Sequence, residues 1–354
     1  MIGIGASQID LLARLSNAAG VSGDESAVRE IVLAELGSSP VKCRVDALGN
    51  LLVTQERDPE KGAPRVLVAA HLDEVGFMLT HHQGDGLFRF ARVGGVDKKS
   101  ILGKRVIVGR EKIPGIIGCQ PVHLAVGEEK TKTIPLEKLR IDVGAEATAR
   151  VKVGDRAVFG TEFKQQGDIL LGKAFDDRMG AATLVGLVKN PPPGIELLAA
   201  FTVQEEIGLR GAGVAARNLD PDLAVALDCT PARDFPSFDE QTENTRYNTR
   251  LGRGPAIYVA DGGTISDPRL VGQLIAAAEA ENLPYQIRQP GGGRTDAAAI
   301  HQQLGGIPSV SLSVPARYLH TPVSLALLSD WEAAVNLIHS GLANLQLEDI
   351  KTDR

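Results

Sequence analysis

The sequence predicts an α/β protein in which helices cover a mixed, largely parallel sheet, with a small β-barrel-like domain inserted into the chain. Two patterns support this fold class. Before about residue 75 and after about residue 165, short β-branched and aliphatic runs alternate with helix-like segments, which is typical of strands buried on both faces. Between these limits, brief alternating runs are mostly bounded by Gly, Asp or Pro, as in small barrels.

The N-terminal region begins with helical periodicity. Residues 7–36 carry apolar side chains at helical spacing, and Ser22-Gly23-Asp24-Glu25 resembles the start of a second helix within them. A turn at residues 46–50 leads into a strand, and the apolar run at 66–70 predicts a buried strand.

After residue 165, strands and helices alternate. We expect helices at 177–189, near 210–217, at 267–281, near 296–303 and at about 330–344, and strands at 195–203, 223–227, 256–259, 285–288 and 309–314. The polar segment 234–253 is expected to form a loop on the substrate side. Such alternation favours a parallel-rich sheet covered by helices.

The candidate functional residues lie on both sides of the β-rich segment in the sequence. We therefore expect an insertion rather than two domains in tandem. Residues 1–74 plus 166–354 would form the catalytic domain, and residues 75–165 would form the inserted β-rich domain.

Composition limits the possible classes of function. The chain has 354 residues, is 43% hydrophobic and carries a net charge of −6, without a Lys/Arg block, so nucleic-acid binding is not expected. No apolar stretch approaches the ~20 residues that span a bilayer, and residues 1–8 lack the features of a signal peptide. The three cysteines are far apart, which fits a reducing compartment. We expect a cytoplasmic protein with no membrane partner.

Potential metal ligands follow the ends of the apolar runs. They are His71 with Asp73 two positions later, the pair Glu205-Glu206, Asp228, His320 and, at the start of a helix, Asp176. In open α/β sheets, ligands bind beyond the carboxyl ends of the strands. Two histidines and three carboxylates at that edge, with one glutamate to spare, indicate a hydrolytic two-metal centre.

Each of these residues alone has a simpler explanation. His71 and Asp73 also fit a surface pair in a loop, paired glutamates usually lie in exposed turns, Asp176 fits a helix cap, and Asp228 fits a turn. Together they are a stronger signal. In the functional interpretation, Asp73 holds the second ring nitrogen of His71, one glutamate binds metal, and Glu205 acts as the general base.

With these motifs, and with the segments Ser22-Gly23 and Arg317-Tyr318-Leu319-His320, the chain resembles the TET aminopeptidases over essentially its whole length. These belong to di-metal metallopeptidase family 42, which also includes glutamyl aminopeptidases and proteins once labelled endoglucanases. The resemblance implies a fold of the di-zinc exopeptidase type. It also implies a metal-dependent aminopeptidase that removes N-terminal residues from peptides.

The resemblance further implies a role for each candidate residue and for the inserted domain. His71 and Asp228 would hold one metal, Glu206 and His320 the other, Asp176 would bridge them, Glu205 would be the general base, and Asp73 the partner of His71. The two metal ions of each subunit would be zinc or cobalt. The inserted domain would mediate dimerisation, act as a lid and help to build a hollow tetrahedral dodecamer with the active sites inside.

One departure from the family pattern concerns specificity. The family commonly has glycine immediately before the Thr-Asp of its glycine-rich loop, whereas this chain has Arg294. A surface position would explain an arginine here. The functional hypothesis is that Arg294 shapes the substrate pocket and favours an acidic side chain through a bidentate contact.

Three other functions remain open from the sequence. A deacylase or carboxypeptidase on the same scaffold would not require a free amine on its substrate. A glycosidase such as an endoglucanase would use a carboxylate pair without metal, but one Trp and four Tyr offer few aromatic faces for a sugar. A non-catalytic scaffold would require a broken site, whereas every expected ligand is present.

Overall fold

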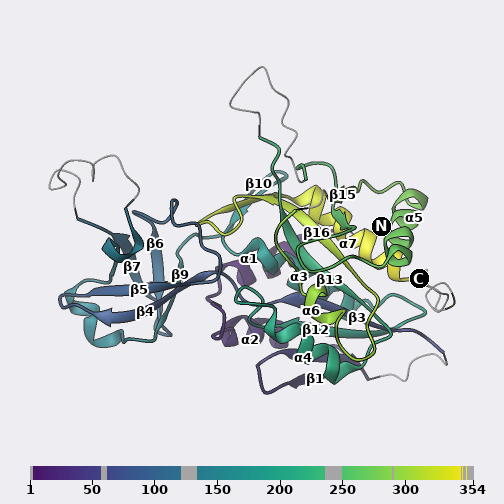
Figure 1. The fold of residues 1–354 in the computed structure, drawn as a ribbon, viewed down its shortest axis with the longest axis horizontal. Helices are drawn as coiled ribbons and strands as arrows, with labels where there is room; N and C mark the ends of the chain where they lie inside the picture. Colours follow the sequence, from purple (N-terminus) through teal and green to yellow (C-terminus); the bar gives the residue numbers. More distant parts are fainter. Residues whose placement is uncertain are drawn as a thin grey trace.

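The computed structural model describes residues 3–56, 62–120, 134–235, 249–288 and 291–343, with residues 345 and 348. Figure 1 shows two bodies side by side, a helix-covered α/β body and a smaller barrel at the left of the view. Of the expected substrate-side loop at 234–253, residues 236–248 lie outside the described residues.

The α/β body is built on one 11-stranded sheet with the order β1-β2-β12-β3-β13-β16-β17-β11-β10, beside which β14 pairs with β15 and β16. Its strands are β1 (Val41–Val45), β2 (Leu51–Gln55), β3 (Arg65–His71), β10 (Lys164–Gln166), β11 (Ile169–Gly172), β12 (Glu196–Thr202), β13 (Leu223–Pro231), β14 (Ala256–Tyr258), β15 (Gln286–Arg288), β16 (Ser309–Arg317) and β17 (Ser324–Leu327). The central strands β12, β3, β13 and β16 run parallel, so their carboxyl ends share one edge of the sheet.

Helices cover both faces of this sheet. They are α1 (Ala6–Asn17), α2 (Ser26–Leu36), α3 (Phe175–Lys189), α4 (Arg210–Leu219), α5 (Pro268–Ala280), α6 (Ala297–Ile300) and α7 (Leu328–Ala343). Because side chains alternate along a strand, Val66, Val68 and Ala70 of β3 belong to a large core with α1, α2, α3, α5 and α7. Leu67 and Ala69 belong to a smaller core with α4 and α6.

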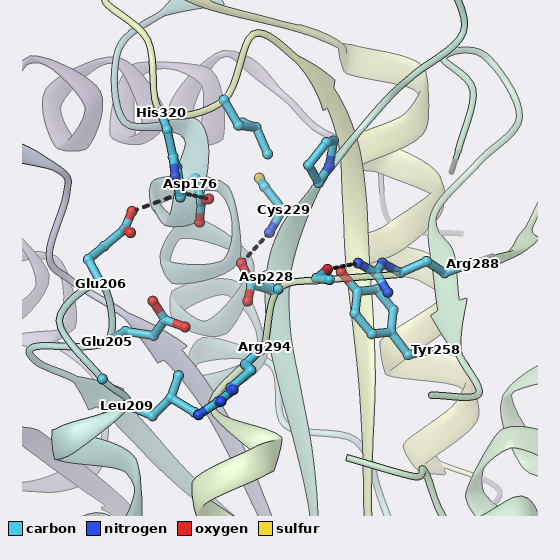
Figure 2. A pocket seen from close by; sticks show the side chains of 15 residues that line it. Asp176, Glu205, Glu206, Leu209, Asp228, Cys229, Tyr258, Arg288, Arg294 and His320 are labelled. Atoms are coloured by element: carbon cyan, nitrogen blue, oxygen red, sulfur yellow. Dashed lines mark hydrogen bonds and ion pairs between the residues drawn. The ribbon is translucent and has the colours of Figure 1, made fainter. Parts of the chain in front are cut away.

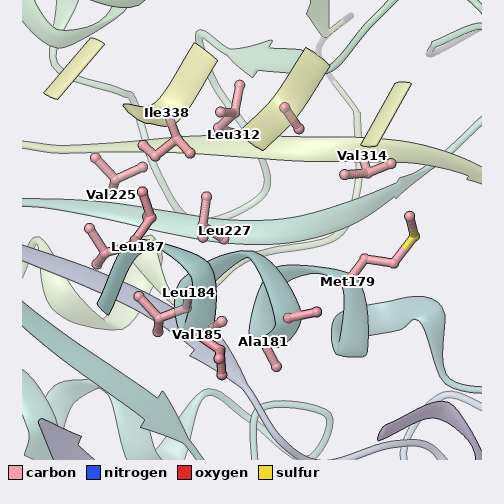
Figure 3. Packing of buried hydrophobic residues seen from close by; sticks show 14 of the residues in the cluster. Met179, Ala181, Leu184, Val185, Leu187, Val225, Leu227, Leu312, Val314 and Ile338 are labelled. Atoms are coloured by element: carbon pink, nitrogen blue, oxygen red, sulfur yellow. The ribbon is translucent and has the colours of Figure 1, made fainter. Parts of the chain in front are cut away.

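Helix α3 is anchored in the large core beside the central strands. Figure 3 shows Leu184 and Leu187 of α3 on the side of Val225 and Leu227 of β13, and Met179 at the other end of the same cluster, on the side of Val314 of β16. This packing fixes the position of the first turn of α3 relative to the carboxyl ends of the parallel strands.

The barrel closes in the order β4-β5-β8-β7-β6-β9. Its strands are β4 (Gly76–His82), β5 (Leu87–Val93), β6 (Arg105–Val108), β7 (Ile113–Gly118), β8 (Arg140–Asp142) and β9 (Arg156–Phe159), with short 3₁₀ turns η3 (Leu136–Lys138) and η4 (Ala145–Arg150). The barrel has its own apolar core, in which the Phe77 ring meets Phe90 and Phe159 edge-on at centroid distances of 5.1 and 5.3 Å. Closure leaves no strand edge unpaired in the barrel.

The predicted fold class is confirmed: a mixed, mostly parallel sheet lies between helices, and a closed six-stranded barrel accompanies it. Strands β1, β4, β10, β11 and β17 were not predicted from the sequence. None of the described helices has the length and apolar character needed to cross a membrane.

Candidate metal centre

The predicted ligands converge because four neighbouring strands deliver them to one edge. His71 is the last residue of β3 and pairs with Thr202 at the end of β12, three residues before Glu205. Asp228 lies in the second half of β13, in register with Ser313 of β16. His320 follows three residues after the end of β16.

The side chains gather in two clusters in which the ligand atoms lie within 4.8 Å of one another. One cluster holds His71, Glu205 and Asp228, and the other holds Asp176, Glu206 and His320. Both face one pocket, which Figure 2 shows with Glu205, Glu206, Asp176, Asp228 and His320 around it.

Asp176 joins the two clusters. Its Oδ1 lies 3.1 Å from Nε2 of His71, and its Oδ2 lies 3.3 Å from Nε2 of His320. Nε2 of His320 is also 3.4 Å from Oε1 of Glu206. The two oxygens of one carboxylate therefore face different histidines, an arrangement suited to a bridging ligand.

Asp73 supports the site from behind. Its Oδ1 accepts a hydrogen bond from the Glu205 amide at 2.9 Å, and its Oδ2 accepts from the Glu206 amide at 3.1 Å and from the Ser22 hydroxyl at 2.6 Å. The Asp73 carboxylate lies 3.5 Å from Nδ1 of His71, while the Asp73 carbonyl oxygen is closer, at 3.1 Å. Asp73 thus positions both glutamates as well as the imidazole.

The first turn of α3 contributes a residue that sequence reasoning missed. Asp177 is fully buried and accepts hydrogen bonds from the His71 amide at 3.2 Å and the Gly180 amide at 3.0 Å. A Cβ at Gly180 would lie 2.4 Å from the Asp177 carboxylate, so the helix needs glycine here. The Asp-Asp pair was visible in the sequence, but helix-cap logic could not assign different tasks to its two members.

Several residues beside the ligands adopt strained backbone conformations. Ala174, Gln204 and His320 have φ values of 55°, 59° and 60°, in the left-handed region that non-glycine residues rarely occupy. Such strain concentrates at functional sites, where the surrounding structure holds the chain in an unfavourable conformation.

The electrostatics of the site reflect many carboxylates in a dry environment. Burial raises the pKa of Glu205 and of Asp228 well above the usual value, and raises that of Glu206 to about 7. Burial also opposes the charged forms of His71 and His320, but hydrogen bonds to Asp176 outweigh it and raise the pKa of both, that of His320 to about 9. In the absence of a cation, these raised pKa values favour protonation of the cluster. A bound cation could replace those protons in compensating the negative charge of the carboxylates.

The donor set fits divalent metal ions. Since a carbonyl oxygen only accepts, the Asp73 carbonyl beside Nδ1 of His71 keeps a proton on Nδ1, so loss of the Nε2 proton would leave the Nε2 lone pair free for a metal beside Asp176. Oε1 of Glu206 is buried without a hydrogen bond. Imidazole nitrogens with carboxylate oxygens are the ligands of zinc and related ions.

The pocket beside the ligands has a volume of about 420 Å³. Beyond the metal-binding residues it is lined by Leu209, Pro231, Tyr258, Arg288 and Arg294, among others. The predicted substrate residue Arg294 is exposed at this pocket. Tyr258 and Arg288 were not singled out from the sequence, where their short strands carry no distinctive motif.

Comparisons with known proteins agree with this arrangement. The family model described as M42 glutamyl aminopeptidase matches residues 49–337. The chain is 33% identical over 358 residues to the glutamyl aminopeptidase of Lactococcus lactis subsp. cremoris, with 96% of this chain and 97% of the relative covered.

Solved structures give the same result. An aminopeptidase from Desulfurococcus kamchatkensis superposes with a TM-score of 0.90 at 34% identity, covering 98% of this chain and 97% of that chain. The TET1 peptidase of Pyrococcus horikoshii, described as able to assemble into a tetrahedron or a large octahedral shell, has a TM-score of 0.82 at 33% identity, covering 96% and 100%.

Proposed function

The chain belongs to the M42 glutamyl aminopeptidase family and is an aminopeptidase that removes N-terminal residues from peptides, and we propose that it does so with two divalent metal ions. In this proposal, each metal has its own pair of ligands and one carboxylate is shared. His71 and Asp228 hold one ion, Glu206 and His320 hold the other, and Asp176 bridges them.

The observation that carries the proposal is the position of Asp176 between the two histidines. Its two oxygens lie 3.1 and 3.3 Å from the Nε2 atoms of His71 and His320. If Asp176 only capped the helix, it would need no histidine beside either of its oxygens. A carboxylate shared by two metal ions presents one oxygen to each ion, and here each oxygen lies beside a histidine nitrogen that could hold an ion.

Bound divalent metals would supply Lewis-acid polarisation of the scissile carbonyl and lower the pKa of water. Glu205 is the proposed general base: it accepts a proton from the attacking water and returns it to the leaving amine. Burial raises the pKa of Glu205, which brings this carboxylate closer to the proton affinity that a base needs at neutral pH. Asp73 keeps Glu205 in place through the Glu205 amide.

Zinc or cobalt is the proposed metal. The set mixes two imidazoles with carboxylates, whereas magnesium and calcium prefer all-oxygen sites.

We also propose a cytoplasmic location, which is supported by the three cysteines, all free thiols.

We propose that residues 75–165 form a dimerisation and lid domain and that the dimers assemble into a dodecamer. The barrel exposes several apolar side chains, namely Leu87, Leu102, Ile116 and Val153. Apolar side chains exposed in this way are available for burial against a second subunit. The related TET1 peptidase of P. horikoshii assembles into closed shells. Light scattering on the purified protein tests the proposal, which fails if the protein is a monomer.

The catalytic assignment is tested with Glu205→Gln, which keeps the shape of the side chain and removes the base. The expected kcat falls by about 10²- to 10⁴-fold, while the metal content measured by mass spectrometry stays that of the wild type. Glu111→Gln, an exposed glutamate of the barrel region, is the matched control and should leave both unchanged. Near-normal turnover of Glu205→Gln contradicts the assignment.

A further inference from the structure

A buried arginine lines the pocket beside the candidate metal ligands, and none of the described carboxylates pairs with it. Arg288 is the last residue of β15 and is only 3% exposed, yet it borders the same pocket as the metal-binding residues. Within the part of the chain that the structure describes, no carboxylate oxygen lies within 4.0 Å of its guanidinium. Burying a charge without a counter-charge is costly, so an acidic group is expected to bind this guanidinium.

The contacts of Arg288 hold the guanidinium in place but do not neutralise it. Nε donates to the Thr230 hydroxyl at 3.3 Å, and Nη2 donates to the Gly292 carbonyl at 2.8 Å. The guanidinium carbon lies 4.3 Å from the centre of the Tyr258 ring. A guanidinium has five N–H donors, of which these bonds use two, and Nη1 has no hydrogen-bond partner.

Neutral neighbours strengthen this conclusion. Burial raises the pKa of Tyr258 above its usual value, so the phenol is uncharged at neutral pH and offers only its ring face to the cation. Elsewhere the same fold pairs its buried cations: Arg178 and Lys173 both contact the buried carboxylate of Glu74, at 3.1 and 2.7 Å. Arg288 departs from that pattern among the described residues, and it does so at the pocket that the candidate metal ligands line.

We propose that Arg288 binds the side-chain carboxylate of an acidic first residue, glutamate or aspartate, of the peptide substrate; this inference rests on the proposed two-metal function of the same site. In Figure 2, Arg288 and Tyr258 lie on the opposite side of Asp228 from Glu205 and Glu206. The reacting end of the substrate occupies the metal-ligand side of the pocket. Its first side chain then extends along the wall toward Arg288.

The two arginines of the pocket have different tasks. Arg294 is exposed, so solvent screens its charge, and it acts as a weaker contact at the rim. Arg288 is buried, and its planar donors are fixed by Thr230 and Gly292. A fixed guanidinium in a dry wall discriminates between charged and neutral side chains more strongly than a mobile one.

The test compares kcat/KM of the Zn²⁺-loaded protein for the p-nitroanilides of Glu, Gln and Leu. Glutamate and glutamine have the same shape, so their ratio isolates the charge. The wild type should prefer Glu over Gln by about 10- to 100-fold, because a neutral amide leaves the buried cation unpaired. Arg288→Met should bring this ratio to within about 3-fold of one.

Arg89→Met is the matched control, since Arg89 is an exposed arginine of the barrel, and it should keep the wild-type ratio. If Arg288→Met does not fold, Arg288→Lys decides. Its ammonium lacks the planar fork, so the Glu/Gln ratio should fall by at least about 3-fold. An unchanged ratio overturns the inference.

The outcomes distinguish a failure of the Arg288 inference from a failure of the proposed function. Hydrolysis of the Leu substrate with a Glu/Gln ratio near one in the wild type overturns the role of Arg288 and leaves the proposed function standing. A Glu/Gln ratio in Arg288→Met equal to that of the wild type also overturns the role of Arg288 and leaves the proposed function standing. Hydrolysis of none of the three substrates overturns the proposed function, and the inference with it.

Discussion

Replacing Glu74 by glutamine should destabilise the α/β body far more than the loss of an exposed ion pair. Glu74 is 2% exposed and accepts hydrogen bonds from Lys173 at 2.7 and 2.9 Å, from Arg178 at 3.1 Å and from the Gly20 amide at 3.2 Å. Lys173 and Arg178 are equally buried. Removing the anion leaves Lys173 and Arg178 buried without the carboxylate that both contact, for which a loss of about 3–5 kcal/mol is typical.

The loss should depend on pH in a defined direction. Burial lowers the pKa of Lys173 to about 8 in the wild type, and loss of Glu74 would lower it further. In the variant, folded Lys173 then releases its proton at a pH where the unfolded chain still binds one. Because stability rises with pH wherever the unfolded state binds more protons, Glu74→Gln should be less destabilising at pH 9 than at pH 7.

Urea unfolding followed by Trp331 fluorescence measures this loss. Trp331 is the only tryptophan and is 1% exposed in the large core, so its emission reports the α/β body. Chelator and a fixed protein concentration keep metal binding and assembly from contributing. Lys189→Met, which removes an exposed partner of Glu35, is the control and should cost about 0–1 kcal/mol. Equal losses of unfolding free energy in Glu74→Gln and Lys189→Met would refute the reasoning.

Three further predictions concern the site. Metal affinity should rise with pH from about 6 to 9, since His71 and His320 have raised pKa values and must lose protons to bind metal. Calorimetry in two buffers measures the proton release. An affinity that does not change with pH would contradict this prediction. Arg294→Ala should lower kcat/KM for the Glu-anilide by less than about 10-fold, and an unchanged preference among Glu-, Leu- and Lys-anilides would exclude a role for Arg294. Ser22→Ala removes the hydroxyl that donates a hydrogen bond to Asp73 at 2.6 Å, and it should lower the free energy of unfolding, measured in urea, by about 1–3 kcal/mol. An unchanged free energy of unfolding would show that water replaces the hydroxyl.

The positions of the candidate metal ligands followed from local sequence signals. A short aliphatic run such as 66–70 predicts a buried strand, and the residue after such a run lies at the carboxyl edge of the sheet. His71, Glu206 and Asp228 could therefore be brought together without knowing the strand order. The same reasoning failed for Asp177, because its task depends on which way the first turn of α3 faces.

The substrate side of the pocket was much less predictable. Tyr258 and Arg288 end strands of only three residues, too short for a periodic pattern, and these strands meet through pairing between β14 and β15. Arg288 is buried, and none of the described carboxylates pairs with it; both features depend on residues distant in the sequence, including Thr230. Edge strands such as β17 were missed for a similar reason, since tertiary pairing rather than local propensity decides them.

The most direct test of the central claim is hydrolysis of aminoacyl-p-nitroanilides by metal-stripped protein, with and without added Zn²⁺ or Co²⁺. The account predicts that release depends on added metal and occurs from substrates with a free amine but not from their N-acetylated forms. Release from N-acetylated substrates, or from free ones without metal, would contradict it. Absence of release with either metal, from protein that is correctly folded, would contradict it equally and favour a deacylase of the same scaffold.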